Sequence, residues 1–168
     1  PIPVDRDSNR ERISAVSVKA AAGYARGYGD PEWIAALPTF DLPLPGVPRD
    51  RTLRFFQIEG DSMLPIPPDS WILCAFTERI EDAGSGRPYI VATRDDGLVF
   101  KRIENRMDIE GDLWMVSNNP SYAPYALDPA HIREIWRAIG WFSTDWPGGT
   151  ATAAQNGTTR AGKWSTKH

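Results

Sequence analysis

Ser62 is a candidate nucleophile because of the turn in which it stands. The apolar, aromatic run from Phe55 to Ile58 predicts a strand, and Gly60-Asp61 directly after it predicts a tight turn that Pro65 closes. A serine on such a turn has an exposed Oγ and lies beside backbone N–H groups that no regular structure uses. Gly-Asp-Ser is also ordinary turn composition, and for these residues alone a plain turn is the more common outcome.

An activated serine needs a general base, and lysine is the best candidate for it here. His168 ends a polar tail, and His131 follows Asp-Pro-Ala, where a surface histidine is the more common outcome. Lysine acts as a base only when neutral, a form that burial favours by lowering the pKa. Strand alternation places Lys101 on the same face as Val99 and Ile103. The same pattern also fits an edge-strand lysine that reaches solvent.

No metal site or cofactor is expected from the sequence. Cys74 is the single cysteine, and no histidine or carboxylate cluster has the spacing of metal ligands. Gly23, Gly27 and Gly29 lack the spacing of a phosphate-binding loop. Cys74 lies in an apolar run, so we expect a buried structural thiol in a reducing compartment.

The composition is that of one ordinary globular domain. The chain has 168 residues, of which 41% are apolar and 24% charged. A net charge of −3 argues against nucleic acid binding by this chain itself. No apolar run reaches the ~20 residues that span a membrane, and no signal peptide is visible, so a cytoplasmic location with no membrane contact is expected.

Short strands and hairpins dominate the predicted secondary structure. Asp95-Asp96-Gly97 and Glu110-Gly111-Asp112 each predict a hairpin turn. Residues 132–142 fit both a helical face and a long strand. The predicted strands cover residues 13–18, 54–59, 71–76, 89–93, 98–103 and 113–117.

Two stretches before Ser62 have opposite helical character. Asp30-Pro31 predicts a helix start, with Asp as N-cap and Pro in the first turn, and Pro38 ends that helix. Residues 19–29 are rich in alanine but interrupted by glycines, each of which costs about 1 kcal/mol in a helix relative to alanine. We therefore expect this second stretch to be extended and mobile.

The ends of the chain are predicted to lie outside the folded domain. Residues 1–14 are polar and mixed in charge, which is typical of a linker, and residues 148–168 form a low-complexity polar tail expected to be disordered. The folded domain is then expected over residues 15–147. Because the chain begins at Pro1 without methionine, we expect a fragment preceded by further residues.

Three motifs, in this order, resemble those of the LexA/UmuD-like self-cleaving serine peptidases. The resemblance covers about residues 16–142 and implies a mainly β, signal-peptidase-like fold of short strands and hairpins with one short helix. It therefore favours a strand over residues 132–142. Two departures are Pro67-Pro68-Asp69-Ser70, where many relatives have Asp-Gly-Asp, and a longer insert over 29–48. The motifs are Gly60-Asp61-Ser62-Met63-x-Pro65, Phe100-Lys101-Arg102-Ile103 and Ser117-Asn118-Asn119-Pro120-x-Tyr122-x-Pro124.

The resemblance implies a Ser-Lys dyad that cuts the chain's own backbone. Ser62 is then the nucleophile and Lys101 the general base, and the backbone N–H groups of Ser62 and Met63 hold the oxyanion. The family cuts after a small residue that is followed by glycine. Ala22-Gly23 is the one Ala-Gly pair upstream of Ser62.

The resemblance also implies partners. Members dimerise through this domain and often carry an N-terminal helix-turn-helix domain. It implies a homodimer, DNA contact only through a domain before Pro1, and a RecA-like activator of cleavage. Self-cleavage would inactivate a repressor-type transcriptional regulator by separating its two parts. Two alternatives stay open: a catalytically silent dimerisation or sensor module, and a UmuD-like polymerase accessory protein.

Overall fold

The fold is mainly β and is built around one long central strand. The computed structural model describes residues 4–5, 10–27, 30–48 and 50–144. Within them, nine strands form a mixed sheet in the order β10-β9-β8-β7-β11-β6-β5-β3-β4, and β1 (Val4–Asp5) pairs separately with β2 (Arg10–Glu11). The sheet strands are β3 (Ile13–Val16), β4 (Thr39–Phe40), β5 (Leu53–Gln57), β6 (Trp71–Thr77), β7 (Arg87–Thr93), β8 (Leu98–Arg106), β9 (Asp112–Val116), β10 (Tyr125–Leu127) and β11 (Ile132–Phe142).

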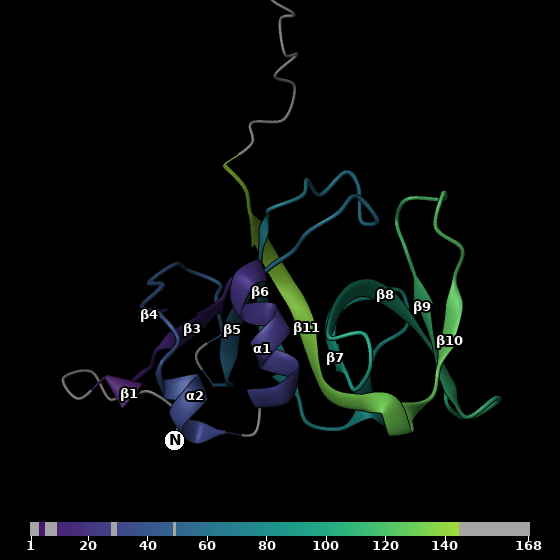
Figure 1. Cartoon of the computed structure of the whole chain (residues 1–168), viewed down its shortest axis with the longest axis horizontal. Helices are drawn as coiled ribbons and strands as arrows, with labels where there is room; N and C mark the ends of the chain where they lie inside the picture. The colour runs from purple at the N-terminus through teal and green to yellow at the C-terminus, as the bar shows by residue number, and fades with distance from the viewer. Residues whose placement is uncertain (1–3, 6–9, 28–29, 49, 145–168) are drawn as a thin grey trace, which may run out of the picture.

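Strand β11 joins the two halves of the sheet (Figure 1). It pairs with β7 over Ile132 to Arg137, and with β6 from Ile135 to its end at Phe142. Adjacent residues Ile135 and Trp136 pack into different hydrophobic clusters. Neighbours on opposite faces are the signature of a strand. The strand that the resemblance favoured over residues 132–142 is therefore confirmed.

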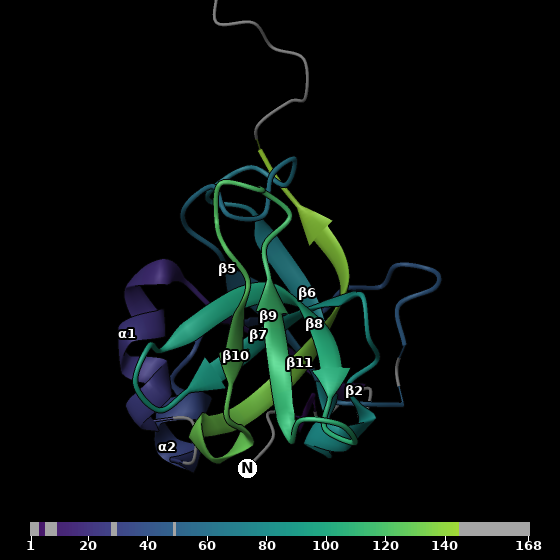
Figure 2. The same ribbon diagram turned by 90° about the vertical axis from the view of Figure 1, so that its right-hand side faces the viewer.

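The predicted hairpins form as expected. Strands β7 and β8 pair from Arg87↔Ile103 to Ala92↔Leu98, and β8 pairs with β9. Gly97 and Gly111 close the two turns with φ of 72° and 80°, a region in which residues with a Cβ are strained. These hairpins form the half of the molecule that carries Lys101 (Figure 2).

The expectation that residues 19–29 are extended is wrong, because α1 (Val18–Gly27) is a helix. Its start is capped twice: the Ser17 Oγ accepts from the Ala20 N–H, and the Gln57 Oε1 accepts from the Val18 N–H, both at 3.2 Å. Tyr24 is fully buried in the central cluster. Packing of this one face outweighs the cost of the glycines in the helix.

The second helix, α2 (Pro31–Ala35), begins as predicted. The Asp30 carboxylate accepts from the Glu32 N–H at 2.9 Å and the Trp33 N–H at 3.4 Å. Trp33 then covers Gly23 of α1, where an added Cβ would lie 3.4 Å from the indole ring. The Trp33 ring of α2 therefore lies against α1 at position 23, where an added Cβ would meet it at ordinary van der Waals distance.

Strand β3 begins inside the stretch that the sequence predicts to be a linker. Ile13 and Ser14, assigned to the linker, belong to β3 and are 5% and 3% exposed. They are buried because β3 is an inner strand, paired with β4 on one edge and β5 on the other. Residues 1–3 and 6–9 of the expected linker, and the expected tail over 148–168, lie outside the described residues.

Three hydrophobic clusters hold the sheet and helices together. The central one packs α1 and α2 against β5, β6 and β11 through residues such as Tyr24, Phe56 and Trp136. Cys74 is fully buried in it, as expected.

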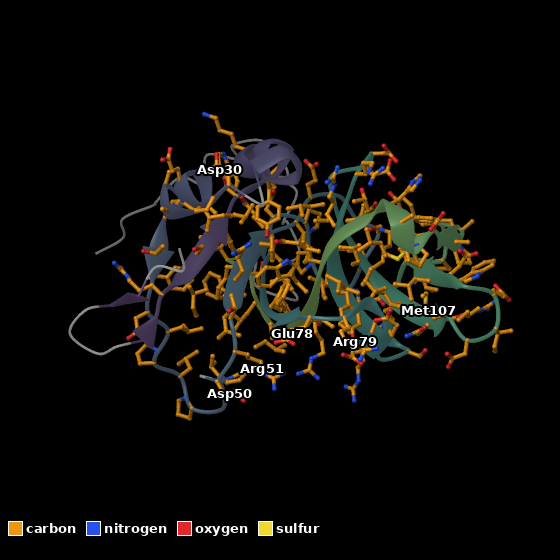
Figure 3. The ribbon with its side chains drawn as sticks, turned by 90° about the horizontal axis from the view of Figure 1, so that it is seen from below. Asp30, Asp50, Arg51, Glu78, Arg79 and Met107 are labelled. Atoms are coloured by element: carbon orange, nitrogen blue, oxygen red, sulfur yellow. The ribbon has the colours of Figure 1, made fainter. Side chains whose placement is uncertain are left out.

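The surface carries charged side chains, and Asp50, Arg51, Glu78 and Arg79 lie along one exposed side (Figure 3). Among the helices of the described residues, none is long and apolar enough to cross a membrane.

Candidate active site

Ser62 and Lys101 meet in space. The Lys101 Nζ lies 2.6 Å from the Ser62 Oγ, within hydrogen-bonding distance. Lys101 comes from β8, where it pairs across the ladder with Tyr89, and Ser62 lies in the turn that follows β5. A nucleophile and a base within direct reach of each other satisfy the geometric requirement for an activated serine.

The turn that carries Ser62 is held by its own backbone and by the core. Gly60 enters it with a φ of 75°, and the Leu64 N–H donates to the Asp61 carbonyl at 3.3 Å. The Met63 side chain is 2% exposed and belongs to the central cluster. One buried neighbour therefore anchors the turn while Ser62 stays partly exposed.

The Pro67-Pro68-Asp69-Ser70 loop, which departs from the pattern of many relatives, still closes against the end of β5. The Ile58 N–H donates to the Ser70 carbonyl at 2.9 Å, and the Asp69 N–H donates back to Ile58 at 3.0 Å. Asp69 takes a φ of 62°, a conformation that aspartate tolerates better than most residues. The departure in sequence therefore leaves the support of the Ser62 turn intact.

The environment of Lys101 favours its neutral form. Its side chain is half-buried, and this desolvation lowers the pKa of the amine below its usual value. Beside the pair opens a cleft of about 170 Å³ with apolar walls that include Phe56, Ile90 and Phe100. A neutral amine can accept the serine proton, so the burial of Lys101 suits a general base.

The third motif of the sequence folds over the Ser62 turn. The Asn119 N–H donates to the Ser62 carbonyl at 2.9 Å, and the Asn118 Nδ2 lies 3.4 Å from the Met63 carbonyl. The Tyr122 hydroxyl donates to the Asp61 carboxylate, and its ring centroid lies 5.9 Å from the Lys101 Nζ. From the sequence, this motif supports the family resemblance but indicates no role for its individual residues.

The N–H groups expected to hold an oxyanion are free of backbone partners. Within the described residues, neither the Ser62 nor the Met63 N–H donates a backbone hydrogen bond. Both residues line the cleft together with Lys101. An oxyanion site also requires that such donors point to the position where the negative charge develops.

The expected cleavage site lies in an unexpected conformation. Ala22 and Gly23 belong to helix α1, and the cleft is lined from the same helix by Val18 and Ala21. The structure thus brings α1 to the cleft but keeps the Ala22-Gly23 peptide group inside the helix. Of the proposed site residues, Ser62, Met63 and Lys101 come together, whereas the Ala22-Gly23 bond is not presented in an extended form.

A metal site and a histidine base are the two other possibilities to consider. No group of three or more His, Cys, Asp or Glu side chains in the described residues could hold a metal ion. His131 is exposed, and its Nδ1 lies 3.1 Å from the Asp95 carboxylate. It belongs to a surface contact near the β7–β8 turn.

Comparison with known families agrees with this geometry. The model of the Peptidase S24-like family matches residues 16–142, from the end of β3 to the end of β11. The chain belongs to the Peptidase S24-like family. The match contains the Ser62 turn, Lys101 and the loop over residues 117–124. The LexA/UmuD-like resemblance is thereby confirmed. No individual curated protein matches the chain.

Proposed function

We propose that this S24-like domain is a serine peptidase that cuts its own chain, with Ser62 as nucleophile and Lys101 as general base. The observation that carries the proposal is the 2.6 Å contact between the Ser62 Oγ and the Lys101 Nζ. The lowered pKa of Lys101 and the apolar cleft support it. These features match the needs of a Ser-Lys mechanism, in which no histidine takes part.

The proposed bond is Ala22-Gly23. The Ser62 Oγ attacks the Ala22 carbonyl carbon while Lys101 takes the serine proton, and the Ser62 and Met63 N–H groups receive the oxyanion. Lys101 returns the proton to the Gly23 nitrogen as the C–N bond breaks. Water, deprotonated by the same lysine, then hydrolyses the ester and frees Ser62.

Cleavage requires α1 to unwind locally. In the helix, backbone hydrogen bonds engage the peptide groups around the bond, whereas attack needs the carbonyl carbon about 3–3.5 Å from the nucleophile. The glycines at 23 and 27 lower the cost of leaving the helix. The described conformation is therefore the uncut, resting form in this proposal.

We further propose that the domain forms a homodimer in a repressor-type regulator. Beyond Arg137, β11 pairs with β6 alone within the described residues, which leaves one edge of the strand open. Trp141 and Phe142 on that segment are 51% and 58% exposed, and they border an apolar groove with Leu44. DNA contact through a domain before Pro1 and a RecA-like activator belong to the same proposal.

A catalytically silent sensor module is the second candidate. The helical state of Ala22-Gly23 favours it, because a peptidase cannot cut a bond that stays in a docked helix. In this alternative, the dimer and its partners persist without cleavage. The two candidates differ in one measurable outcome, which is whether the chain is cut.

Intact-mass spectrometry after incubation at pH 7 and about pH 10 tests the peptidase. We expect fragments split between Ala22 and Gly23, formed faster at high pH because the neutral fraction of Lys101 rises with pH. Ser62→Ala and Lys101→Ala should abolish them. Lys19→Ala, which removes an exposed lysine on α1, is the matched control and should cleave. A wild type that stays intact at both pH values would favour the silent module.

A further inference from the structure

We propose that Asn119 is a positioning residue that orients the oxyanion donors of Ser62 and Met63. The inference rests on the proposed peptidase function and adds a residue to its machinery. It starts from three hydrogen bonds of one asparagine: the Asn119 N–H to the Ser62 carbonyl at 2.9 Å, its Nδ2 to the Asp61 carbonyl at 3.2 Å, and the Ser121 N–H to its Oδ1 at 3.0 Å.

The geometry of the peptide group relates these contacts to the direction in which the Ser62 and Met63 N–H groups point. The Asp61 carbonyl and the Ser62 N–H belong to one planar peptide group, and the Ser62 carbonyl and the Met63 N–H belong to the next. In a trans peptide the C=O and N–H bonds point in opposite directions. Because both carbonyls point toward Asn119, both N–H groups point away from it.

The side that the donors face is the catalytic one. Ser62 and Met63 line the cleft together with Lys101, while Asn119 is not among the lining residues. Neither N–H has a backbone acceptor in the described part of the chain. In this inference, Asn119 holds two consecutive peptide planes so that the N–H groups of Ser62 and Met63 face the cleft.

Asn119 is itself fixed by the loop around it and by the strand of the base. The Tyr122 N–H donates to the Asn119 carbonyl at 3.1 Å. The neighbouring Asn118 accepts at its Oδ1 from the Arg102 Nε at 2.7 Å. Since Arg102 follows Lys101 in β8, one strand positions both the base and the loop that holds the oxyanion donors.

The chain offers a matched control for Asn119. The Asn105 Nδ2 donates to the Glu81 and Ala83 carbonyls, each at 3.0 Å, and its Oδ1 accepts from the Met107 N–H at 3.0 Å. Both asparagines therefore clamp a distant loop with the amide nitrogen and cap a residue two positions later with the amide oxygen. Of these two asparagines, Asn119 hydrogen-bonds to the Ser62 turn and Asn105 does not.

The test compares the pH profiles of self-cleavage in Asn119→Ala, Asn105→Ala and wild type. We expect the plateau rate of Asn119→Ala to fall at least 10-fold, toward the roughly 10²–10³-fold loss of a missing oxyanion donor. The pH of half-maximal rate should stay unchanged, because Lys101 is untouched. Asn105→Ala should cleave at the wild-type rate. Asn119→Asp, which keeps the Ser121 cap but cannot donate to Asp61, provides a second variant if the alanine variant fails to fold.

The outcomes separate the inference from the proposed function. If the wild type cleaves and both Asn119 variants cleave within twofold of it, Asn119 has no positioning role. An equal loss in Asn105→Ala, or a shifted pH midpoint in Asn119→Ala, would show a general structural effect and would also overturn the inference. A wild type that never cleaves would overturn the peptidase function, and the inference with it.

Discussion

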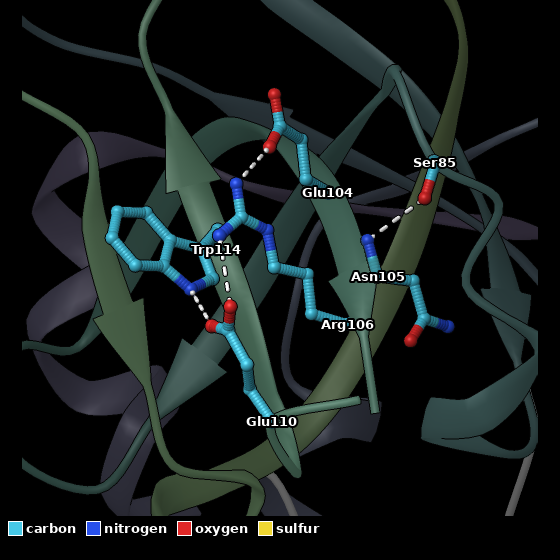
Figure 4. Close-up of polar contacts among 6 residues, drawn as sticks. All are labelled: Ser85, Glu104, Asn105, Arg106, Glu110 and Trp114. Atoms are coloured by element: carbon cyan, nitrogen blue, oxygen red, sulfur yellow. Dashed lines mark hydrogen bonds and ion pairs between the residues drawn. The ribbon is translucent and has the colours of Figure 1, made fainter. Parts of the chain in front are cut away.

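Two groups of side chains in this protein have nearly the same chemistry but opposite surroundings. In the interior, the Arg54 guanidinium lies 4.4 Å from the Trp136 ring centroid, and the Trp136 Nε1 donates to Glu134 at 2.9 Å. On the surface, the Arg106 guanidinium lies 4.5 Å from the Trp114 ring centroid. The Trp114 Nε1 donates to Glu110 at 2.9 Å (Figure 4).

The two groups differ in burial, and the buried group also contains Tyr24. The side chains of Arg54 and Glu134 are 11% and 14% exposed, against 36% and 42% for Arg106 and Glu110. In the buried group, the Tyr24 hydroxyl donates to Glu134 and accepts from Arg54. Burial raises the pKa of Tyr24 above its usual value, so its hydroxyl keeps the proton that it donates.

The comparison shows that burial decides the structural role of the same chemistry. On the surface, water replaces any contact that is lost, so an ion pair contributes little. In the interior, a charge that loses its partner has no replacement. Through Tyr24, the buried group also fastens α1, which contains the Ala22-Gly23 bond, to β5 and β11. We call Arg54, Glu134, Trp136 and Tyr24 the buried network.

The largest effect is expected from Glu134→Ala. The change leaves the Tyr24 hydroxyl and the Trp136 N–H without their shared acceptor, and it removes the carboxylate that lies 3.9 Å from the Arg54 guanidinium. We expect the free energy of unfolding to fall by about 3–5 kcal/mol, as for other buried pairs that lose one partner. Urea denaturation followed by tryptophan fluorescence measures it. A decrease of less than about 1 kcal/mol in the free energy of unfolding would contradict the expected difference between the buried and the exposed group.

A smaller effect is expected from Tyr24→Phe, which removes one hydroxyl and keeps the ring contacts with Phe56 and Trp33. Loss of the two buried hydrogen bonds of this hydroxyl, to Glu134 and from Arg54, should cost about 1–3 kcal/mol. Relative to the wild type, amide hydrogen exchange in the variant should accelerate more in α1 than in β11. Under the proposed function, easier unwinding of α1 should also speed self-cleavage. Unchanged exchange in α1 would show that the network does not fasten the helix.

Lys101 is an intermediate case, a half-buried cation with a lowered pKa. The folded state then binds fewer protons than the unfolded state between the lowered pKa and the usual value of about 10.4. Stability should therefore rise with pH across that window. We expect this rise in the wild type and not in Lys101→Met, measured by urea denaturation at several pH values. If stability changed with pH in the same way in the wild type and in Lys101→Met, this expectation would be contradicted.

The smallest effect is expected from Glu110→Ala on the surface. Arg106 keeps Glu104 as a partner at 3.2 Å and stays hydrated. The urea midpoint should change far less than in Glu134→Ala, and added salt should remove the difference because it screens exposed charges. A salt-independent loss as large as that of Glu134→Ala would show that burial does not separate the two groups.

Much of the fold could be predicted because its signals are local. The turns at Gly97 and Gly111, the cap of α2 by Asp30 and the strand before Ser62 each depend on residues a few positions apart. Helix α1 was predicted wrongly because its stabilising contacts are distant in sequence. Tyr24 bonds to Glu134, which lies 110 positions away in the sequence, and helix propensities do not include such contacts.

The residue types and the candidate pair follow from the amino-acid order, since Ser62 on a turn and Lys101 in an apolar strand can be recognised from their neighbours. Only the folded chain shows that their side chains meet at 2.6 Å, that Asn119 hydrogen-bonds to the Ser62 turn, and that Ala22-Gly23 lies in a docked helix. The reason is physical. Local propensity acts over a few residues, whereas burial and hydrogen bonds between distant strands form only once the chain has folded.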